Sequence, residues 1–384
     1  MELYFCTYFD HHYLSRGLAL YFSLRRHCPF FRLWVLCMDP QSFEVLSRLR
    51  LPNVHTIALE DFEKGDEALV NAKKERTAIE YYFTCTPSLP LYILNNFREA
   101  DLVTYLDADL FFFSDPTPLY EEISNSSVAI IGHRFPANLQ HLEQSAGIYN
   151  VGWVSFRRDA NGLECLRWWR KKCLQWCYDR VADNRYADQK YLDEWPQRFR
   201  GVKVLRHKGA NLAPWNISKY RVKTHGDTVT VDEQALIFFH FHGLKENFDR
   251  QWSASAFELG IRTYDPNFQT YGARCRRFIR RRIFAPYIRM VRVVNELYMP
   301  KPASGAMFTS LRGTSVSAPS RTGSLLSRAT VLKTRLDFIK GILFGRYILA
   351  FEFGKTTTAL ATFRTSQRLT FTGTLVLLLA ADAL

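Results

Sequence analysis

ADLVTYLDADLFFF, residues 100–113, joins a short apolar run to two carboxylates and three phenylalanines. The run up to Leu106 has the length and composition of a buried strand. Asp107 and Asp109 follow the carboxyl end of that strand, where open α/β sheets bind their ligands. Two carboxylates separated by one residue can face the same way and share a hard divalent cation. This stretch therefore predicts an α/β sheet with an acidic site at one edge.

Around this stretch, short apolar runs alternate with longer helix-like segments over about the first 250 residues. Strands are expected at residues 3–9, 31–39 and 54–60, and amphipathic helices at residues 13–27 and 42–50. Strands that alternate with helices are typical of an α/β fold built on a mainly parallel, Rossmann-like sheet. We therefore expect this part of the chain to have this fold class.

The composition limits the kind of protein and its partners. The chain has 384 residues, of which 47% are hydrophobic, so a large core is available. Its formal net charge of +14 favours an anionic partner: nucleotide phosphate, nucleic acid or an acidic membrane face. The eight cysteines form no CxxC pair, as expected for reduced thiols in a cytoplasmic protein. Neither a signal peptide nor a transmembrane run of about 20 apolar residues is predicted.

The character of the sequence changes beyond about residue 260. Residues 1–260 carry the α/β pattern, and residues 261–300 are rich in arginine, which predicts a basic amphipathic helical extension. Residues 301–384 predict a flexible Ser/Thr-rich linker followed by an apolar and basic tail. The arginines suit an anionic membrane surface or a solvated helix face. Nucleic acid is not an expected partner, because no nucleic-acid module surrounds them.

The acidic pair has three interpretations when it is taken alone. It can bind a divalent cation, it can combine a helix cap with a surface acid, or it can belong to a phosphatase of the haloacid dehalogenase type. The phosphatase pattern DxDx[TV] requires Thr or Val where this chain has Phe111. That residue disfavours the phosphatase, and the choice between the other two depends on the rest of the sequence.

Five motifs occur in a fixed order between residues 2 and 250: FCTYFDHHYLSRGLALYFSL (5–24), YLDADLFFFSDP (105–116), YNVGWVSFRRD (149–159), YADQKYL (186–192) and HFHGLK (240–245). In this order and spacing the chain resembles the GT-A nucleotide-sugar glycosyltransferases, particularly the family 8-like group. The order is far more specific than any single motif. The resemblance implies a GT-A catalytic domain, and a nucleoside-diphosphate sugar as the donor substrate.

By this resemblance Asp107, Asp109 and His240 bind a divalent metal ion, Mn²⁺ or Mg²⁺. His242 would share the same side of a strand and is the alternative third ligand, and both histidines could instead be satisfied inside a core strand. Lys245 falls where the family places a lysine against the diphosphate of the donor. Here HGLKENF stands where the family often has a Lys-Pro-Trp run, so the role of Lys245 is the less secure part of the resemblance.

The resemblance also implies a donor pocket. Thr7 and Tyr8 fall where the family holds the base and ribose, and the ring of Tyr8 could stack on the base. Asn150 and Gly152 match an Asn-x-Gly element that contacts the sugar or the acceptor, where a carboxamide both donates and accepts hydrogen bonds. The structural alternative for Tyr8 is a partly exposed aromatic residue at a strand end. The alternative for Asn150 and Gly152 is an ordinary turn that leads into a strand.

Three further residues complete the predicted site. The resemblance implies that Asp188 and Gln189 are the catalytic residues. They lie at the start of an expected helix, where the family binds the donor sugar and places a glutamine near the reacting carbon. The alternative for Asp188 is a helix N-cap. Trp215, flanked by amides, is the expected platform for the acceptor, with a buried structural tryptophan as its alternative.

The predicted enzyme transfers a hexose from a nucleoside-diphosphate sugar to a hydroxyl of a glycan, lipid-linked or protein acceptor. The resemblance implies retention of the anomeric configuration. A cytoplasmic location, at the cytoplasmic face of the membrane, would suit surface glycan or lipopolysaccharide synthesis. Two other classes stay open: a metal-dependent phosphohydrolase or nucleotidyltransferase that uses the same carboxylates, and a non-catalytic membrane-docked scaffold.

Overall fold

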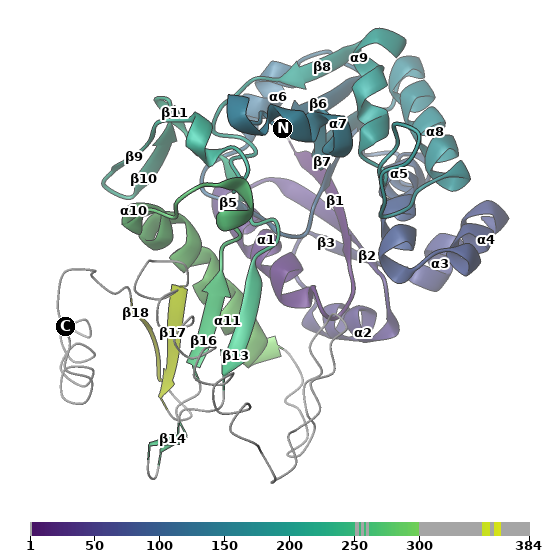
Figure 1. Ribbon diagram of the computed structural model, residues 1–384. Helices are drawn as coiled ribbons and strands as arrows, with labels where there is room; N and C mark the ends of the chain where they lie inside the picture. Colours follow the sequence, from purple (N-terminus) through teal and green to yellow (C-terminus); the bar gives the residue numbers. More distant parts are fainter. Residues whose placement is uncertain are drawn as a thin grey trace, which may run out of the picture. The chain divides into compact units, whose positions relative to one another are not determined.

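The computed structural model describes residues 2–249, 253–254, 257–258, 261–298, 348–353 and 357–361 (Figure 1). The chain forms two compact units. The first comprises Met1–His242, Thr270–Ala273 and Pro286–Leu297, and the second comprises Gly243–Gln269, Arg274–Ala285 and Tyr298–Leu384. The domain boundaries that the composition suggests, at residues 260 and 300, stay predictions.

A seven-stranded sheet with the strand order β3-β2-β1-β4-β7-β6-β8 organises the first unit. All pairings are parallel except those of β7, which runs antiparallel to both β4 and β6. The expected α/β fold with a mainly parallel sheet is therefore confirmed. The strands are β1 (Leu3–Phe9), β2 (Phe31–Cys37), β3 (Val54–Ala58), β4 (Leu102–Leu106), β6 (Val128–Gly132), β7 (Tyr149–Arg157) and β8 (Val202–Leu205).

Local sequence signals set the starts of the longer helices. Asp39, Asp66 and Asp159 accept hydrogen bonds from backbone N–H groups in the first turns of α2, α4 and α8. Thr77 and Glu80 form a reciprocal capping box that starts α5. The helices of this unit that precede β8 are α1 (Leu14–His27), α2 (Pro40–Leu49), α3 (Leu59–Glu63), α4 (Glu67–Glu75), α5 (Ala78–Asn96), α6 (Thr117–Ile123), α7 (Glu143–Ala146), α8 (Ala160–Gln175) and α9 (Trp195–Arg198).

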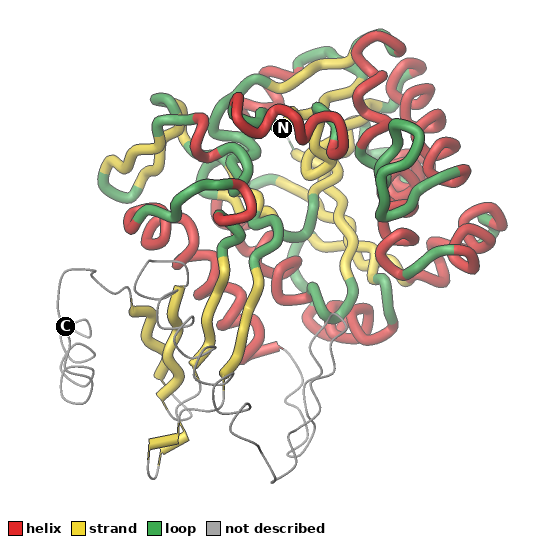
Figure 2. The backbone as a smooth tube through the Cα atoms, in the orientation of Figure 1, coloured by secondary structure: helices red, strands yellow, loops and turns green. Residues whose placement is uncertain are grey.

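The core lies between the sheet and these helices, which appear red around the yellow strands in Figure 2. Helices α5 and α8 pack against each other along one face of the sheet, and both contact its strands (Figure 1). Leu89 of α5 and Trp169 of α8 are completely buried there. Burial of a large apolar side chain stabilises a fold by roughly 1.5–3 kcal/mol, so these two helices anchor the sheet.

The phenylalanines that follow the acidic pair form a second packing layer. Phe111 and Phe112 belong to β5 (Leu110–Phe112), which pairs with β12 (Phe238–His240), and Phe113 follows it. The ring of Phe112 packs against Phe238, which stacks on Trp153 of β7 at a centroid distance of 5.5 Å. This aromatic contact explains why three phenylalanines follow a polar turn, because they attach β5 and β12 to the central sheet.

The first unit also contains three short 3₁₀-helices: η1 (Ala137–Leu142), η2 (Lys190–Glu194) and η3 (Ile217–Lys219). The helix expected to start at Asp188 is the 3₁₀-helix η2, which begins one residue after Gln189. A helix therefore begins where the sequence predicts one, as a short 3₁₀ segment that is followed directly by α9. A separate small sheet contains β9 (Val222–His225), β10 (Thr228–Val231) and β11 (Gln234–Ala235).

The second unit contains a sheet with the order β13-β16-β17-β18. The helical extension predicted for residues 261–300 begins only at Arg277, because the alternating stretch Ile261–Asp265 forms β16 and pairs with β13. Its C-terminal helix is confirmed. The elements of this unit are β13 (Lys245–Asp249), β14 (Ser253–Ala254), β15 (Phe257–Glu258), β16, α10 (Arg277–Ile279), the π-helix η5 (Arg280–Phe284), β17 (Ile348–Phe353) and β18 (Thr357–Ala361). Two further elements, η4 (Gln269–Tyr271) and α11 (Ala285–Tyr298), belong mainly to the first unit.

Most of the predicted linker and tail, residues 301–384, lies outside the described residues. The eight cysteines are all free thiols, as predicted. Among the helices that the structure describes, none is both long and apolar enough to cross a membrane.

Candidate functional site

The acidic pair lies in the turn between two strands of different sheets. Strand β4 ends at Leu106 and β5 begins at Leu110, so Asp107 and Asp109 occupy the connection. The register of β5 with β12 places His240 opposite Leu110, and the backbone N–H of Phe241 donates to the carbonyl of Asp109 at 3.0 Å. The β5–β12 pairing thus brings a distant histidine to the acids.

These three side chains form a compact group of metal-binding atoms. Asp107, Asp109 and His240 each offer one ligand atom, and all three atoms lie within 4.8 Å of one another. His240 Nε2 lies 3.1 Å from Asp109 Oδ1 and 3.5 Å from Asp107 Oδ2. The histidine is buried, whereas the side chain of Asp107 remains 30% exposed. Two carboxylates and one imidazole fit a divalent ion such as Mn²⁺ or Mg²⁺, and the exposed edge of Asp107 leaves a route to it.

The charges of the group are strongly coupled. Burial raises the pKa of Asp107 to about 6, although the charge of His240 opposes this shift. Burial acts in the same direction on Asp109, but the charge and hydrogen bond of His240 outweigh it and lower the pKa of that carboxyl to about 2. For His240 itself burial favours the neutral ring, yet the charge of Asp109 outweighs it and raises the pKa. The arrangement therefore favours positive charge between the two acids.

A chain of hydroxyl groups leads from the acids into the protein. Tyr105 donates to Asp107 Oδ1 at 2.9 Å and is hydrogen-bonded to Tyr8. The hydroxyl of Tyr8 lies 3.0 Å from Thr86 Oγ1, and Thr86 in turn is hydrogen-bonded to Asp188. Asp188 is thereby connected to a member of the metal-binding group through three side-chain hydroxyls.

Asp188 is a buried residue, and the pKa of its carboxyl is raised. The residue is only 5% exposed, and its backbone carbonyl accepts a hydrogen bond from Trp169 Nε1 at 2.8 Å. Burial and the charge of Asp107 raise the pKa of Asp188 to about 7, against the opposing hydrogen bond from Thr86. A carboxyl held in this way, near a candidate metal site, is typical of functional positions.

Asn150 and Gln189 are joined by a hydrogen bond. Asn150 Nδ2 donates to Gln189 Oε1 at 3.0 Å, and Gln189 Nε2 donates to the carbonyl of Ala146 at 2.8 Å. Asn150 lies on β7, beside the point where the pairing of β6 and β7 shifts register between Ile130 and Ile131. The structure thus brings the predicted sugar-binding asparagine and the predicted catalytic glutamine together, while their roles stay predictions.

Gly152, the other half of the Asn-x-Gly element, faces the metal-binding group. A Cβ atom at this position would lie 2.7 Å from Asn150 Oδ1 and 2.9 Å from two atoms of the His240 ring. Real Cβ atoms essentially never approach other heavy atoms so closely. Glycine is required here for the close packing of the two side chains, a reason that the local sequence does not reveal.

Thr7 and Tyr8, the predicted nucleotide-binding residues, lie near the end of β1, whose last residue is Phe9. Thr7 is completely buried, and its Oγ1 has no hydrogen-bond partner among the residues that the structure describes. The ring of Tyr8 makes an edge contact with Tyr82 and a tilted contact with Tyr105. The hydroxyl of Tyr8 is turned toward Thr86. The predicted contact between Tyr8 and the nucleotide base would therefore use the face of the ring.

Trp215, the predicted acceptor platform, is 3% exposed. Its ring makes edge contacts with both His240 and His242, at centroid distances of 5.1 and 5.5 Å. Trp215 Nε1 donates to the carbonyl of His133 at 2.9 Å. The tryptophan thus supports the histidines of the site from inside, and its contact with an acceptor stays a prediction. Lys245 begins β13 in the second unit, and its role also stays a prediction.

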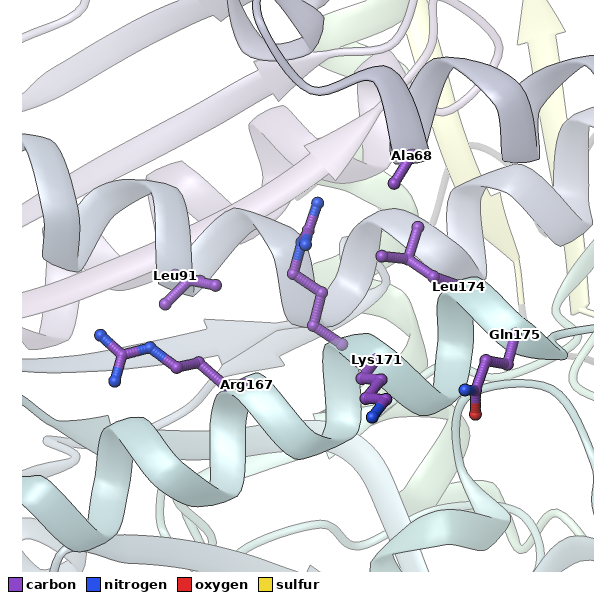
Figure 3. Close-up of a pocket in the computed structure, with 7 residues that line it drawn as sticks. Ala68, Leu91, Arg167, Lys171, Leu174 and Gln175 are labelled. Atoms are coloured by element: carbon purple, nitrogen blue, oxygen red, sulfur yellow. The ribbon is translucent and has the colours of Figure 1, made fainter.

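A pocket of about 340 Å³ lies apart from this group, between α4, α5 and α8 (Figure 3). Arginine and lysine side chains of α8 line it together with leucine and alanine residues. Arg170 is already paired with Asp66 and donates to Ser88 Oγ at 3.1 Å. Figure 3 shows that Arg167 and Lys171 point in different directions. The residues that line it include no carboxylate, imidazole or thiol.

Sequence patterns did not identify several residues that shape the site. Tyr105 and Thr86 lie within apolar segments, where a single hydroxyl has no distinctive spacing. His133 follows β6 directly and is 4% exposed, in contact with Trp215 and Asn150. A polar residue next to a buried strand was a usable signal for His133, but its partners are distant in sequence.

No family model matches the chain. Two uncharacterized proteins of Bacillus subtilis (strain 168) are similar to it in sequence. YfnD is 33% identical over 241 residues, which cover 62% of this chain and 77% of YfnD. YfnF is 31% identical over 248 residues, which cover 63% of this chain and 81% of YfnF.

Several solved structures are similar in part. Galactosyltransferase LgtC, in complex with donor and acceptor sugar analogs, has a TM-score of 0.40 at 17% identity and covers 63% of this chain and 87% of LgtC. Mouse xyloside xylosyltransferase 1 has a TM-score of 0.42 at 15% identity and covers 63% of this chain and 98% of that protein. Glycosyltransferases are thus among the structures to which the chain is similar.

Proposed function

The chain belongs to the same protein family as YfnD and YfnF of Bacillus subtilis, and we propose that it is a metal-dependent glycosyltransferase. The observation that carries the proposal is the group of Asp107, Asp109 and His240, whose ligand atoms lie within 4.8 Å of one another. These residues stand in the order and spacing in which the sequence resembles nucleotide-sugar glycosyltransferases. The donor in this proposal is a nucleoside-diphosphate hexose, and the acceptor is a hydroxyl of a glycan, a lipid-linked sugar or a protein.

In this proposal, the polar side chains of the first unit have separate roles in binding the metal ion and the donor sugar. Asp107 and Asp109 supply two carboxylate oxygens and His240 a ring nitrogen for Mn²⁺ or Mg²⁺. When bound, such an ion supplies positive charge that neutralises a departing diphosphate. Asp188 accepts a hydrogen bond from a hydroxyl of the donor sugar when it is ionised. Asn150 offers its Oδ1 to the same sugar, beside the metal-binding group.

The finer parts of the proposal come from the family resemblance and the charge of the chain. The resemblance implies that the anomeric configuration is retained. The net charge of +14 suits both an anionic donor and an anionic membrane surface. A cytoplasmic enzyme that works at the membrane face on a surface glycan or lipopolysaccharide would use both.

The first test is a thermal-shift panel of UDP-, GDP- and TDP-sugars, each with and without Mn²⁺. A ligand that binds only the folded protein at a hundredfold excess over its Kd stabilises it by about 2.7 kcal/mol. Asp109→Asn should abolish the Mn²⁺-dependent shift. Asp115→Asn is the matched control, since this exposed acid of the same stretch caps the backbone N–H of Thr117 and an asparagine can do the same.

An assay of nucleoside diphosphate and phosphate release, run on the sugars of the panel, separates the competing functions. A transferase releases the nucleoside diphosphate faster when an acceptor is added. A phosphohydrolase would release phosphate with water as the only acceptor. A nucleotidyltransferase would form a nucleotide sugar and pyrophosphate from a nucleoside triphosphate and a sugar phosphate. A non-catalytic scaffold would give no Mn²⁺-dependent nucleotide shift in the parent protein, and that result would contradict the proposed function.

A further inference from the structure

Three polar side chains from separate segments form a line beside the metal-binding group. His133 follows β6, Asn150 lies on β7, and Gln189 precedes η2. Asn150 Nδ2 lies 3.5 Å from His133 Nε2 and 3.0 Å from Gln189 Oε1. His133 and Asn150 are 4% and 6% exposed. In such a buried position each donor and acceptor needs a partner, so the direction of every hydrogen bond can be worked out.

Backbone groups decide how the two carboxamides are oriented. The N–H of Gly152 donates to Asn150 Oδ1 at 3.1 Å, which leaves Asn150 Nδ2 on the other side. The N–H of Val151 lies 3.3 Å from Gln189 Oε1, and the carbonyl of Ala146 accepts from Gln189 Nε2. A backbone N–H can only donate and a carbonyl can only accept. Gln189 therefore turns its oxygen toward β7, where it also accepts from Asn150.

The same logic fixes the tautomer of His133. Its Nδ1 lies 2.9 Å from the carbonyl of Gly147, which can only accept, so Nδ1 carries the proton. Burial lowers the pKa of His133 to about 3, and the ring stays neutral at physiological pH. Nε2 then has a free lone pair directed at Asn150 Nδ2. One N–H of Asn150 is satisfied by His133 and the other by Gln189.

We propose that His133 is a positioning residue, which accepts from Asn150 and thereby holds Asn150 and Gln189 in one orientation. In this orientation the oxygen of Gln189 faces the protein, and the second lone pair of Asn150 Oδ1 remains for a sugar hydroxyl. Gln189 then supports the site rather than presenting its oxygen to a substrate. This inference rests on the proposed function, because it assigns Asn150 to the donor sugar.

Loss of the ring nitrogens would leave a buried N–H of Asn150 without an acceptor. The cost of an unsatisfied buried donor is about 1–3 kcal/mol, enough to move the side chain toward solvent. His133→Phe removes both nitrogen contacts of the ring, the acceptor for Asn150 and the Nδ1–H bond to the carbonyl of Gly147. The other contacts of position 133 do not use the imidazole nitrogens. Its backbone carbonyl accepts from Trp215 and Asn216, and its ring stacks on Phe135 at a centroid distance of 4.8 Å.

The experiment compares the full-length parent, His133→Phe, His133→Gln and Phe135→Leu. Phe135→Leu is the packing control, since it disturbs the ring stack but removes no hydrogen bond. Gln at position 133 can place an oxygen near the former Nε2 and is the conservative rescue. The first readout is NMR of the Asn150 side-chain amide, assigned through Asn150→Ala. The second is the split of kcat and KM with the donor found in the thermal-shift panel.

We expect the Asn150 amide signal to shift and to exchange faster with water in His133→Phe, and to stay unchanged in Phe135→Leu. We expect kcat to fall about tenfold in His133→Phe, with Mn²⁺-dependent binding of the nucleoside diphosphate unchanged and partial recovery in His133→Gln. An unaltered Asn150 signal in His133→Phe would overturn the positioning role, even if the parent transfers sugar. Equal effects of His133→Phe and Phe135→Leu would also overturn it. A parent that binds no nucleotide sugar would instead remove the proposed function on which the inference rests.

Discussion

Gly152 lies so close to His240 that a Cβ atom at position 152 would be 2.9 Å from both Nδ1 and Cε1 of the ring. The glycine is part of β7, and the histidine ends β12, so the two residues join the central sheet to the small β5–β12 sheet. The absence of a side chain at position 152 lets the ring reach Asp109. The metal-binding geometry thus depends on a residue that carries no ligand atom.

Gly152→Ala should therefore weaken Mn²⁺ binding by about tenfold or more, because the methyl group must displace His240 or Asn150. Mn²⁺ titration followed by electron paramagnetic resonance measures this directly. Gly132→Ala is the control: it is a glycine of the neighbouring β6, where the nearest atom to a new Cβ is 3.3 Å away. Equal Mn²⁺ affinity of Gly152→Ala and the parent would mean that His240 is not a ligand.

The two histidines of HFHG can be separated by alanine variants. His240 Nε2 lies 3.1 Å from Asp109 Oδ1, whereas His242 is exposed and lies beyond the end of β12. His240→Ala should lower Mn²⁺ affinity by at least about tenfold, and His242→Ala by less than about threefold. Isothermal titration of both variants with Mn²⁺ tests this order, and the reverse order would assign the ligand role to His242.

Local sequence was enough to predict the part of the site that comes from one continuous stretch. The apolar run and its length predicted that a strand ends at Leu106, and β4 ends there. His240 was predicted only from the order of motifs, because its contact with Asp109 depends on the register of β12 with β5. A pairing between strands so distant in sequence leaves no local pattern.

The polar residues that support the site could not be predicted from local sequence for the same reason. His133, Tyr105 and Thr86 are single polar residues in apolar surroundings, where composition alone predicts core packing. Their partners come from three different segments of the first unit, so the hydrogen bonds exist only after the sheet has formed.

A stability prediction concerns Arg158, which follows β7. Its guanidinium donates to the carbonyls of Leu94 in the last turn of α5, of Phe97 at its C-cap and of Ala100 in the segment that follows. Arg158→Ala leaves these carbonyls without that donor and should lower the free energy of unfolding by about 2–4 kcal/mol. Denaturant titration measures the change.

The control for Arg158 is Arg198→Ala. This arginine is 48% exposed and forms a surface ion pair with Glu194, so its loss should cost less than about 0.5 kcal/mol. If the two variants are equally stable, the carbonyls of α5 have other partners, and Arg158 does not stabilise the helix end.

The raised pKa of Asp188 predicts that ionisation of this buried carboxyl lowers the free energy of unfolding. The pKa rises from 3.8 to about 7 on folding, chiefly through burial. Between these values the folded protein keeps a proton that the unfolded chain has released, so stability falls as pH rises through this window. Above it the carboxylate is buried in its charged form, and the loss of stability is complete.

Asp188→Asn removes the charge and keeps a side chain of nearly the same shape. We expect the variant to be more stable than the parent at about pH 8, on the order of 2–4 kcal/mol, and the difference to vanish near pH 4. Urea unfolding across this range measures it, with Asp101→Asn as the control, since that side chain is 71% exposed. The same variant should lose the donor-dependent thermal shift. If Asp188→Asn were less stable than the parent at pH 8, the carboxylate would be stabilised by its neighbours, and its burial would carry no cost.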